Sequence, residues 1–327
     1  MRRKGSLIEK FLYSLRYRLA EFALRAFVAI LPWVPYSLLV LYTRFSAWVT
    51  FGCLWKYRTR MENNVAMAMG EELTTPVERT ALVWRAWNNF ALGILETSAV
   101  MHFPREQIIH FVTIEGEDHL KRAIAKGKGV IALSAHLGAF TLIGARLAAA
   151  GYPFSVVVKH PGDERFARLI DRYRAQIGIG TISAKPRREA ARGILKALRE
   201  NRIVLVIADE FKSGGLMVNF LGQISPAPRG PATLALRTGA PTLPMFATRR
   251  PDGAPILRIG AEVELIRSED VEQSVAETTR LFTRYLEEAI RRYPDQWNWL
   301  GFRRNGIAGH GIRRRRRKRR GDSQPQP

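Results

Sequence analysis

The strongest constraint on the fold is an alternation of short apolar segments with helical ones. Residues 129–135, GVIALSA, form an apolar run of the length of a buried strand, and residues 139–150 predict a helix. Residues 154–159, FSVVVK, predict a second strand. A strand, a helix and a strand in this order imply parallel pairing, because the helix returns the chain to the same end of the sheet.

The same pattern recurs further along the chain. We expect three more strands at 202–208, 241–247 and 256–265, and three more helices at 188–200, 231–238 and 271–292. The sequence therefore predicts an α/β fold with a mainly parallel sheet flanked by helices. Residues 61–305 are expected to form this domain.

The first 60 residues have a different character. Residues 26–43 carry no charge, and residues 45–55 are again apolar after Arg44. A bilayer-spanning helix needs about 20 apolar residues, and Pro32 and Pro35 interrupt the first run. We expect residues 1–60 to be a membrane-anchoring helical segment, shaped as a hairpin or a kinked, shallow anchor. A single span and a buried pair of core helices are the alternatives.

The chain is strongly basic, with 52 Lys and Arg against 29 Asp and Glu and a net charge of +23. Residues 313–320 are all Arg or Lys, and their composition predicts that 306–327 is a disordered tail. This charge favours an anionic partner, such as a membrane, a phosphorylated substrate, an acidic protein or a nucleic acid. No motif that reads nucleic acid accompanies it, so no specific nucleic-acid partner is expected.

His136 is the foremost candidate among the histidines. It follows the strand at 129–135 where a helix is about to begin, and sites in open α/β sheets form at this end of the strands. A helix N-terminus favours the neutral imidazole, which can act as a base, and nearby amides, including that of Gly138, could stabilise an oxyanion. The alternative is a structural histidine. No pair of histidines has metal-ligand spacing, and the single cysteine, Cys53, excludes cysteine clusters, so no metal is expected.

Four stretches together resemble one family. They are 135–140 (AHLGAF), 207–210 (IADE) with 220–222 (FLG), 229–241 (RGPATLALRTGAP) with Pro244 and Arg249, and 293–299 (YPDQWNW). Over roughly residues 10–305 the chain resembles the bacterial lipid A late acyltransferases, which are lauroyl and myristoyl transferases of the lysophospholipid acyltransferase superfamily.

The resemblance implies a glycerolipid acyltransferase-like fold and a membrane-associated O-acyltransferase. His136 would deprotonate a hydroxyl of a lipid acceptor, and that oxygen would attack the thioester of an acyl donor. The donor would be acyl carrier protein, with acyl-CoA as the alternative, and no further cofactor is implied. The acceptor would be a phosphorylated glucosamine lipid or another lipid, and the enzyme would work among anionic lipids on the cytoplasmic face of the inner membrane.

One position departs from the family pattern. The family has an acid five residues after the histidine, and this chain has Thr141, which could orient the ring by a hydrogen bond but carries no charge. Asp209 and Glu210, at another predicted strand end, are the leading candidates to replace the acid. Two further candidates are Asp163 and Glu164. Alternatively, the activated thioester tolerates the loss, or the chain is a catalytically degenerate lipid-binding protein.

The remaining candidates have simpler placements. Lys159 ends a predicted strand and Arg229 precedes a helix, so each is a candidate for binding a substrate phosphate. Arg249 and its neighbour Arg250 end a strand before a turn and are expected at the surface. Trp297 and Trp299 are expected to cap the core.

Overall fold

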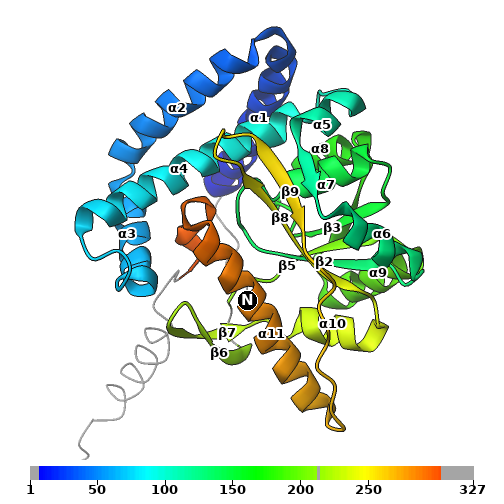
Figure 1. The fold of residues 1–327 in the computed structure, drawn as a ribbon. Helices are drawn as coiled ribbons and strands as arrows, with labels where there is room; N and C mark the ends of the chain where they lie inside the picture. Colours follow the sequence, from blue (N-terminus) through cyan, green and yellow to red (C-terminus); the bar gives the residue numbers. More distant parts are fainter. Residues whose placement is uncertain (1–6, 212–213, 303–327) are drawn as a thin grey trace, which may run out of the picture.

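The computed structural model describes residues 7–211 and 214–302, so the predicted tail at 306–327 lies outside the described residues (Figure 1). The strands are β1 (Thr113–Glu115), β2 (Val130–Ser134), β3 (Phe154–Val158), β4 (Ile179–Ser183), β5 (Ile203–Ile207), β6 (Leu216–Phe220), β7 (Gln223–Ala227), β8 (Thr242–Arg249) and β9 (Pro255–Ile259). The α-helices are α1 (Leu7–Ile30), α2 (Tyr36–Cys53), α3 (Trp55–Met69), α4 (Pro76–Ala99), α5 (Arg105–Phe111), α6 (Glu117–Ala125), α7 (Leu142–Ala149), α8 (Glu164–Gln176), α9 (Arg187–Arg199), α10 (Gly230–Thr238) and α11 (Val271–Arg292). Short 3₁₀ helices are η1 (Leu31–Trp33), η2 (Pro294–Gln296) and η3 (Trp299–Gly301).

The central sheet has the strand order β1-β9-β8-β2-β5-β3-β4, and β6 pairs with β7 in a separate hairpin. Within the central sheet every neighbouring pair is parallel except β8 and β9. Helices lie on both sides of it (Figure 1). The predicted α/β fold with a mainly parallel sheet flanked by helices is therefore confirmed.

Strand β2 lies at the centre of the sheet and is buried along its whole length. Ile131 and Leu133 belong to a core layer that includes residues of α10 and α11, whereas Val130 and Ala132 belong to a second layer with residues of α6 and α7. Because alternate side chains of a strand point to opposite faces, a strand covered on both faces is apolar throughout. This explains why 129–135 is an uninterrupted apolar run.

Three strands differ from the sequence-based expectation. β9 ends at Ile259 rather than at 265, and it runs antiparallel to β8 because a short turn at 250–254 joins the two. β4 and the β6–β7 hairpin were not predicted. The hairpin alternates buried side chains such as Val218 and Phe220 with exposed ones such as Met217 and Asn219, so its sequence contains no apolar run.

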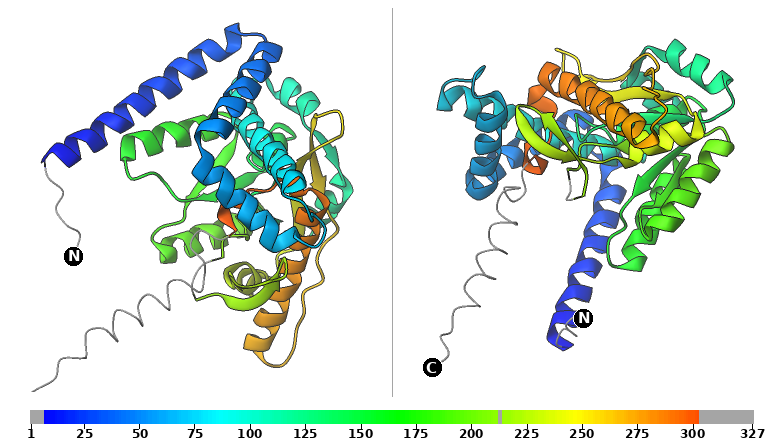
Figure 2. Two further views of the ribbon diagram at one scale, coloured as in Figure 1. Left: turned by 90° about the vertical axis from the view of Figure 1, so that its left-hand side faces the viewer. Right: turned by 90° about the horizontal axis from the view of Figure 1, so that it is seen from below.

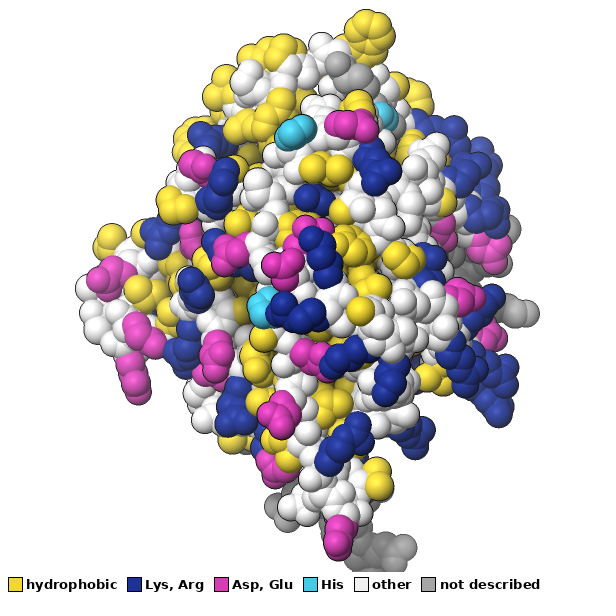
Figure 3. Space-filling model, turned by 45° about the vertical axis from the view of Figure 1, so that its right-hand side comes forward, with side chains coloured by type: hydrophobic (Ala, Val, Ile, Leu, Met, Phe, Trp, Pro, Cys, Tyr) yellow, Lys and Arg dark blue, Asp and Glu magenta, His cyan; other side chains and the backbone are white. Residues whose placement is uncertain are grey.

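The N-terminal region is helical and bent. The 3₁₀ turn η1 separates α1 from α2 in the stretch that contains Pro32 and Pro35. α1 projects from the body (Figure 2) and contacts α8, where Arg165 bonds to Glu21 at 3.0 Å. α2 packs along α4, and the Trp87 indole donates to Thr50 Oγ1 at 3.1 Å. On the face seen in Figure 3, hydrophobic side chains gather at the upper end of the molecule, where these helices meet.

Within residues 7–211 and 214–302, no single helix is both long and apolar enough to cross a bilayer, and α2 with α3 meets that requirement only as a pair bent by 87°. α3 also runs through residue 60, where the boundary of the anchoring segment was expected. Its residues Met61 and Val65 belong to the main core layer.

Candidate active site

His136 and Asp209 meet at the carboxyl edge of the sheet. β2 and β5 pair in parallel with Ser134 opposite Ile207, and each candidate lies two residues beyond its strand. His136 Nδ1 lies 2.8 Å from Asp209 Oδ1, and the His136 backbone N–H donates to Asp209 Oδ2 at 2.8 Å. The structure thus brings together two predicted residues that are 73 positions apart in the chain.

The Asp209 carboxylate is held by a third donor. Trp297 Nε1 donates to Asp209 Oδ2 at 2.9 Å, and the Asp209 side chain is only 2% exposed. Trp297 itself packs edge-on against Phe220, Trp299 and Phe302. Trp297 therefore caps the core, as predicted, and it also orients Asp209, which the sequence analysis missed. Its position two residues before another buried tryptophan suggested only packing.

This arrangement suits proton transfer at His136. A carboxylate accepts hydrogen bonds, so its contact with Nδ1 makes Nδ1 the donor and leaves the lone pair on Nε2. The ring is 31% exposed and can be reached by a substrate. Phe140 packs edge-on against the ring with 5.1 Å between the centroids, which limits its rotation. A histidine that a buried carboxylate orients in this way has the geometry of a general base.

The backbone amide of Gly138, the predicted oxyanion donor, has a partner within the protein. Its backbone N–H already donates to the carbonyl oxygen of Gln296 at 2.7 Å. Gly138 instead allows a close approach: its φ is +60°, and a Cβ atom there would lie 2.1 Å from the carbonyl oxygen of Ala247 in β8. Together with the bond from Ala139 N–H to Ala247 O at 3.0 Å, this fixes the His136 loop against β8.

Thr141 occupies the position of the family's usual acid, and its hydroxyl faces another helix. Thr141 Oγ1 lies 2.5 Å from Thr97 Oγ1 on α4, while the orientation of the His136 ring comes from Asp209. Glu210 is exposed beside Asp209.

The two weaker acid candidates have partners of their own. The Asp163 carboxylate caps α8 by accepting from Phe166 N–H at 3.0 Å. Glu164 pairs with Arg168 on the same helix at 3.4 Å. Each contact is local to α8, and it explains the position of the carboxylate without any role at His136.

The two predicted phosphate-binding residues lie in different places. Lys159 is exposed directly after β3, on the same sheet edge as His136 and two strands away, or about 10 Å. Arg229 forms an ion pair with Glu272 in the first turn of α11. The 22-residue helix α11 is about 33 Å long, and Trp297 follows its other end. Arg229 therefore lies far from His136, and the ion pair accounts for its position.

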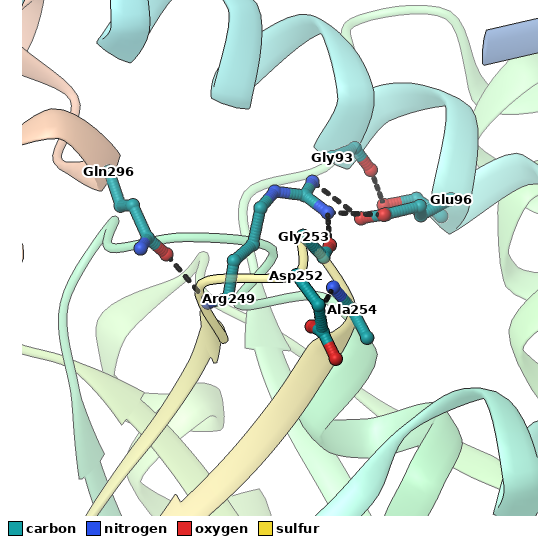
Figure 4. Close-up of polar contacts among 8 residues, drawn as sticks. Gly93, Glu96, Arg249, Asp252, Gly253, Ala254 and Gln296 are labelled. Carbon is teal, nitrogen blue, oxygen red and sulfur yellow. Dashed lines mark hydrogen bonds and ion pairs between the residues drawn. The ribbon is translucent and has the colours of Figure 1, made fainter.

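Arg249 is buried, so its predicted surface position is wrong. It is 9% exposed, and its guanidinium binds the Glu96 carboxylate on α4 through contacts of 2.5 Å and 2.8 Å (Figure 4). Its backbone N–H donates to Gln296 Oε1 at 2.8 Å. Burial, followed by the Glu96 charge, raises the pKa of nearby Tyr36 to about 12. The reason for the burial is that α4 covers the end of β8, which the local sequence does not indicate.

Within residues 7–211 and 214–302, no three His, Cys, Asp or Glu side chains gather closely enough to ligate a metal ion. The fold and the site thus define an α/β protein with a histidine–carboxylate pair at the carboxyl edge of a parallel sheet. A family described as bacterial lipid A biosynthesis acyltransferase matches residues 8–304. The chain belongs to this family.

Three relatives show how the similarity is distributed. A phosphatidylinositol mannoside acyltransferase of Mycolicibacterium smegmatis is 29% identical over 185 residues, which are 56% of this chain and 59% of the relative. Its namesake in Mycobacterium tuberculosis is 33% identical over 134 residues, 40% of this chain and 42% of the relative. A lipid A biosynthesis palmitoleoyltransferase of Escherichia coli is 23% identical over 68% of this chain and 71% of the relative. The chain thus spans less than two thirds of the mycobacterial relatives' length.

Proposed function

We propose that the protein is an O-acyltransferase that moves a fatty acyl chain from a thioester donor to a hydroxyl group of a glycolipid or phospholipid. The observation that carries this proposal is the contact of 2.8 Å between His136 Nδ1 and the buried carboxylate of Asp209. Membership of the acyltransferase family and the names of the relatives, which act in lipid A and phosphatidylinositol mannoside synthesis, support the substrate class.

The proposed reaction uses His136 as base and then as acid. Nε2 takes the proton from the acceptor hydroxyl as its oxygen attacks the thioester carbonyl carbon. The carbon–sulfur bond then breaks, and the imidazolium returns the proton to the leaving thiol. Asp209 stabilises the imidazolium and keeps the ring in the required tautomer. The Gly138 amide takes no part, because it is bonded to Gln296.

Acyl carrier protein is the donor that we propose first, with acyl-CoA as the alternative. Acyl carrier protein is acidic, and a chain with a net charge of +23 would attract it. We propose an acceptor among phosphorylated glycolipids, of the lipid A or the phosphatidylinositol mannoside type, and the names of the relatives support this proposal. Both donors and both acceptor types carry negative charge, which suits this surface.

We further propose that the N-terminal helices dock on the cytoplasmic face of the inner membrane. Leu38, Leu41, Phe45 and Trp48 on α2 are each between 54% and 65% exposed. Their spacing of three, four and three residues places them on one side of the helix, while Leu39 and Ala47 are buried on another. An exposed apolar stripe of this kind is typical of a helix that lies in a membrane interface.

The first experiment measures transfer of a labelled acyl chain to a bacterial lipid extract, from acyl carrier protein and from acyl-CoA in parallel. The His136→Ala variant is expected to lower the rate at least about 100-fold, because it removes the general base. His110→Ala, an exposed histidine on α5, is the matched control and should leave the rate unchanged. Unchanged transfer in His136→Ala would refute the mechanism.

The second candidate function is lipid binding without catalysis, which Thr141 favours because the family's acid is missing there. The position of Asp209 weakens that reading, since it supplies a carboxylate to the ring. Folded wild-type protein that transfers no label from either donor would support the binding protein over the enzyme.

A further inference from the structure

An arginine-rich pocket lies where α2, α4, the turn after β8 and the end of α11 meet. Its volume is about 830 Å³, which falls within the range of small-molecule sites. Asp295 is the one acidic residue of its lining. The basic residues of the lining are Arg44, Arg85, Arg249, Arg250, Arg258 and Arg292.

Three of these arginines are neutralised by acidic residues. Arg249 pairs with Glu96, Arg250 with Asp252, and Arg258 with Glu115. The other three, Arg44, Arg85 and Arg292, are exposed at the pocket and form no ion pair with an acid of residues 7–211 and 214–302. The lining therefore has a surplus of positive charge that the described part of the protein does not balance.

Two arginines of the lining also carry hydrogen-bond donors without partners among the described residues. The Nε atoms of Arg249 and Arg250 are buried and make no hydrogen bond among the described residues. Leaving a buried donor unpaired costs about 1–3 kcal/mol, so such donors usually meet a water, an ion or a ligand. The buried Nε donors of Arg249 and Arg250, and the three exposed arginines of the lining that form no ion pair among the described residues, are two independent indications of an anionic ligand.

The pocket adjoins the candidate active site through one residue. Gln296 lines the pocket and accepts from Arg249 N–H with its side chain, while its backbone carbonyl accepts from Gly138 N–H. The next residue, Trp297, bonds to Asp209. A ligand in the pocket would therefore lie beside the segment that holds the histidine–carboxylate pair.

We infer that this pocket binds a phosphate ester. Planar guanidinium groups match phosphate oxygens in paired hydrogen bonds, and arginine is the preferred residue for this contact. The side chains of Trp84 and Leu92 line the same pocket and offer apolar contact to the group that carries the phosphate. The phosphate belongs either to the headgroup of the lipid acceptor or to the acyl donor, and this assignment to a substrate rests on the proposed function.

The test uses the full-length Arg85→Gln/Arg292→Gln variant. Both side chains are exposed and have no ion pair among the described residues, so the fold should be retained. Arg188→Gln/Arg192→Gln on α9 removes the same charge outside the pocket, from exposed positions that form no ion pair within residues 7–211 and 214–302. Calorimetry measures binding of two soluble probes, CoA and glycerophosphoinositol, and circular dichroism checks folding. We expect at least about 10-fold weaker binding in the pocket variant and little change in the control.

The probe that loses affinity identifies the source of the phosphate. Loss confined to CoA assigns the pocket to the donor, and loss confined to glycerophosphoinositol assigns it to the acceptor headgroup. Equal losses of binding affinity in the pocket variant and in the α9 control, or a wild-type protein that binds neither probe, would overturn the inference. Because neither probe is acylated, this result is independent of catalysis: pocket-dependent binding without any acyl transfer would refute the proposed function and leave the phosphate site standing.

Discussion

The carboxylate that His136 contacts comes from the neighbouring strand. A carboxylate strengthens a histidine base when it lies within hydrogen-bonding distance of the second ring nitrogen, whatever its position in the sequence. In this chain Thr141 occupies the position where the family has its acid, and the Asp209 carboxylate contacts the His136 ring from the end of β5. Parallel pairing of β2 and β5 makes this possible, because it brings both strand ends to one edge.

Asp209→Asn should lower the transfer rate about 10²–10⁴-fold. The amide preserves the shape of the side chain, but it cannot stabilise the imidazolium and can turn its NH₂ group toward Nδ1, which favours the wrong tautomer. Glu210→Gln, the matched change at the exposed neighbour, should leave the rate nearly unchanged. Steady-state transfer kinetics compare the two. A larger loss in Glu210→Gln would assign the carboxylate role to Glu210 instead.

Trp297 allows a test of whether catalysis depends on the hydrogen bond that orients the Asp209 carboxylate. Trp297→Phe removes a buried donor to the carboxylate and should destabilise the protein by about 1–3 kcal/mol. Trp299→Phe is the control, because Trp299 is also buried and its indole donates elsewhere, to Pro294 O at 2.7 Å.

We expect similar losses of unfolding free energy in these two variants, with a fall in kcat for Trp297→Phe alone. Urea unfolding and transfer kinetics provide the two readouts. Equal values of kcat would show that the Trp297 bond serves stability only.

At the scale of elements, the loop between β2 and α7 depends on its contact with β8. Gly138→Ala would place a methyl group 2.1 Å from Ala247 O at a φ of +60°. Gly222→Ala, at a φ of +71° in the β6–β7 turn, has the same backbone strain with no atom within 4 Å.

We expect Gly222→Ala to lose about 1–2 kcal/mol from the left-handed conformation alone. Gly138→Ala should lose clearly more stability and also its activity, because the loop must shift away from β8. Urea unfolding measures both variants. Equal stability losses would show that the loop can move without disturbing the fold.

The elements differ in how well the sequence predicted them. β2, β3 and β5 were predicted because they are interior strands of the sheet and are largely apolar. β4 contains Gly180 and Thr181 and is only partly buried after its first residue, so it lacks such a run. The periodicity of apolar residues reflects which faces of an element are buried. It does not predict an edge strand or a hairpin whose faces are only partly covered.

At the scale of the whole molecule, the apolar stripe on α2 and the net charge should act together at a membrane. Leu41→Gln/Trp48→Gln should weaken binding to vesicles of phosphatidylglycerol and phosphatidylethanolamine at least about 10-fold, because burying a large apolar side chain contributes about 1.5–3 kcal/mol. Val77→Gln/Val271→Gln changes two exposed apolar residues outside the stripe and serves as the control.

Vesicle sedimentation measures this binding. Added salt should weaken the binding of every variant, because it screens the attraction between basic residues and the anionic lipids. If the stripe variant sediments with vesicles as strongly as the wild type, α2 is not the docking surface.

The sequence by itself determined the fold class, the catalytic candidate His136 and the family, because apolar periodicity and short motifs are local properties of the chain. Only the tertiary structure decided between Asp209 and Glu210 as the residue in contact with the ring, bonded Trp297 to that carboxylate and buried Arg249 against Glu96. These contacts join strands and helices up to 153 residues apart. Hydrogen bonds and ion pairs act over a few ångströms in space, and the packing of elements determines which distant residues come within that range.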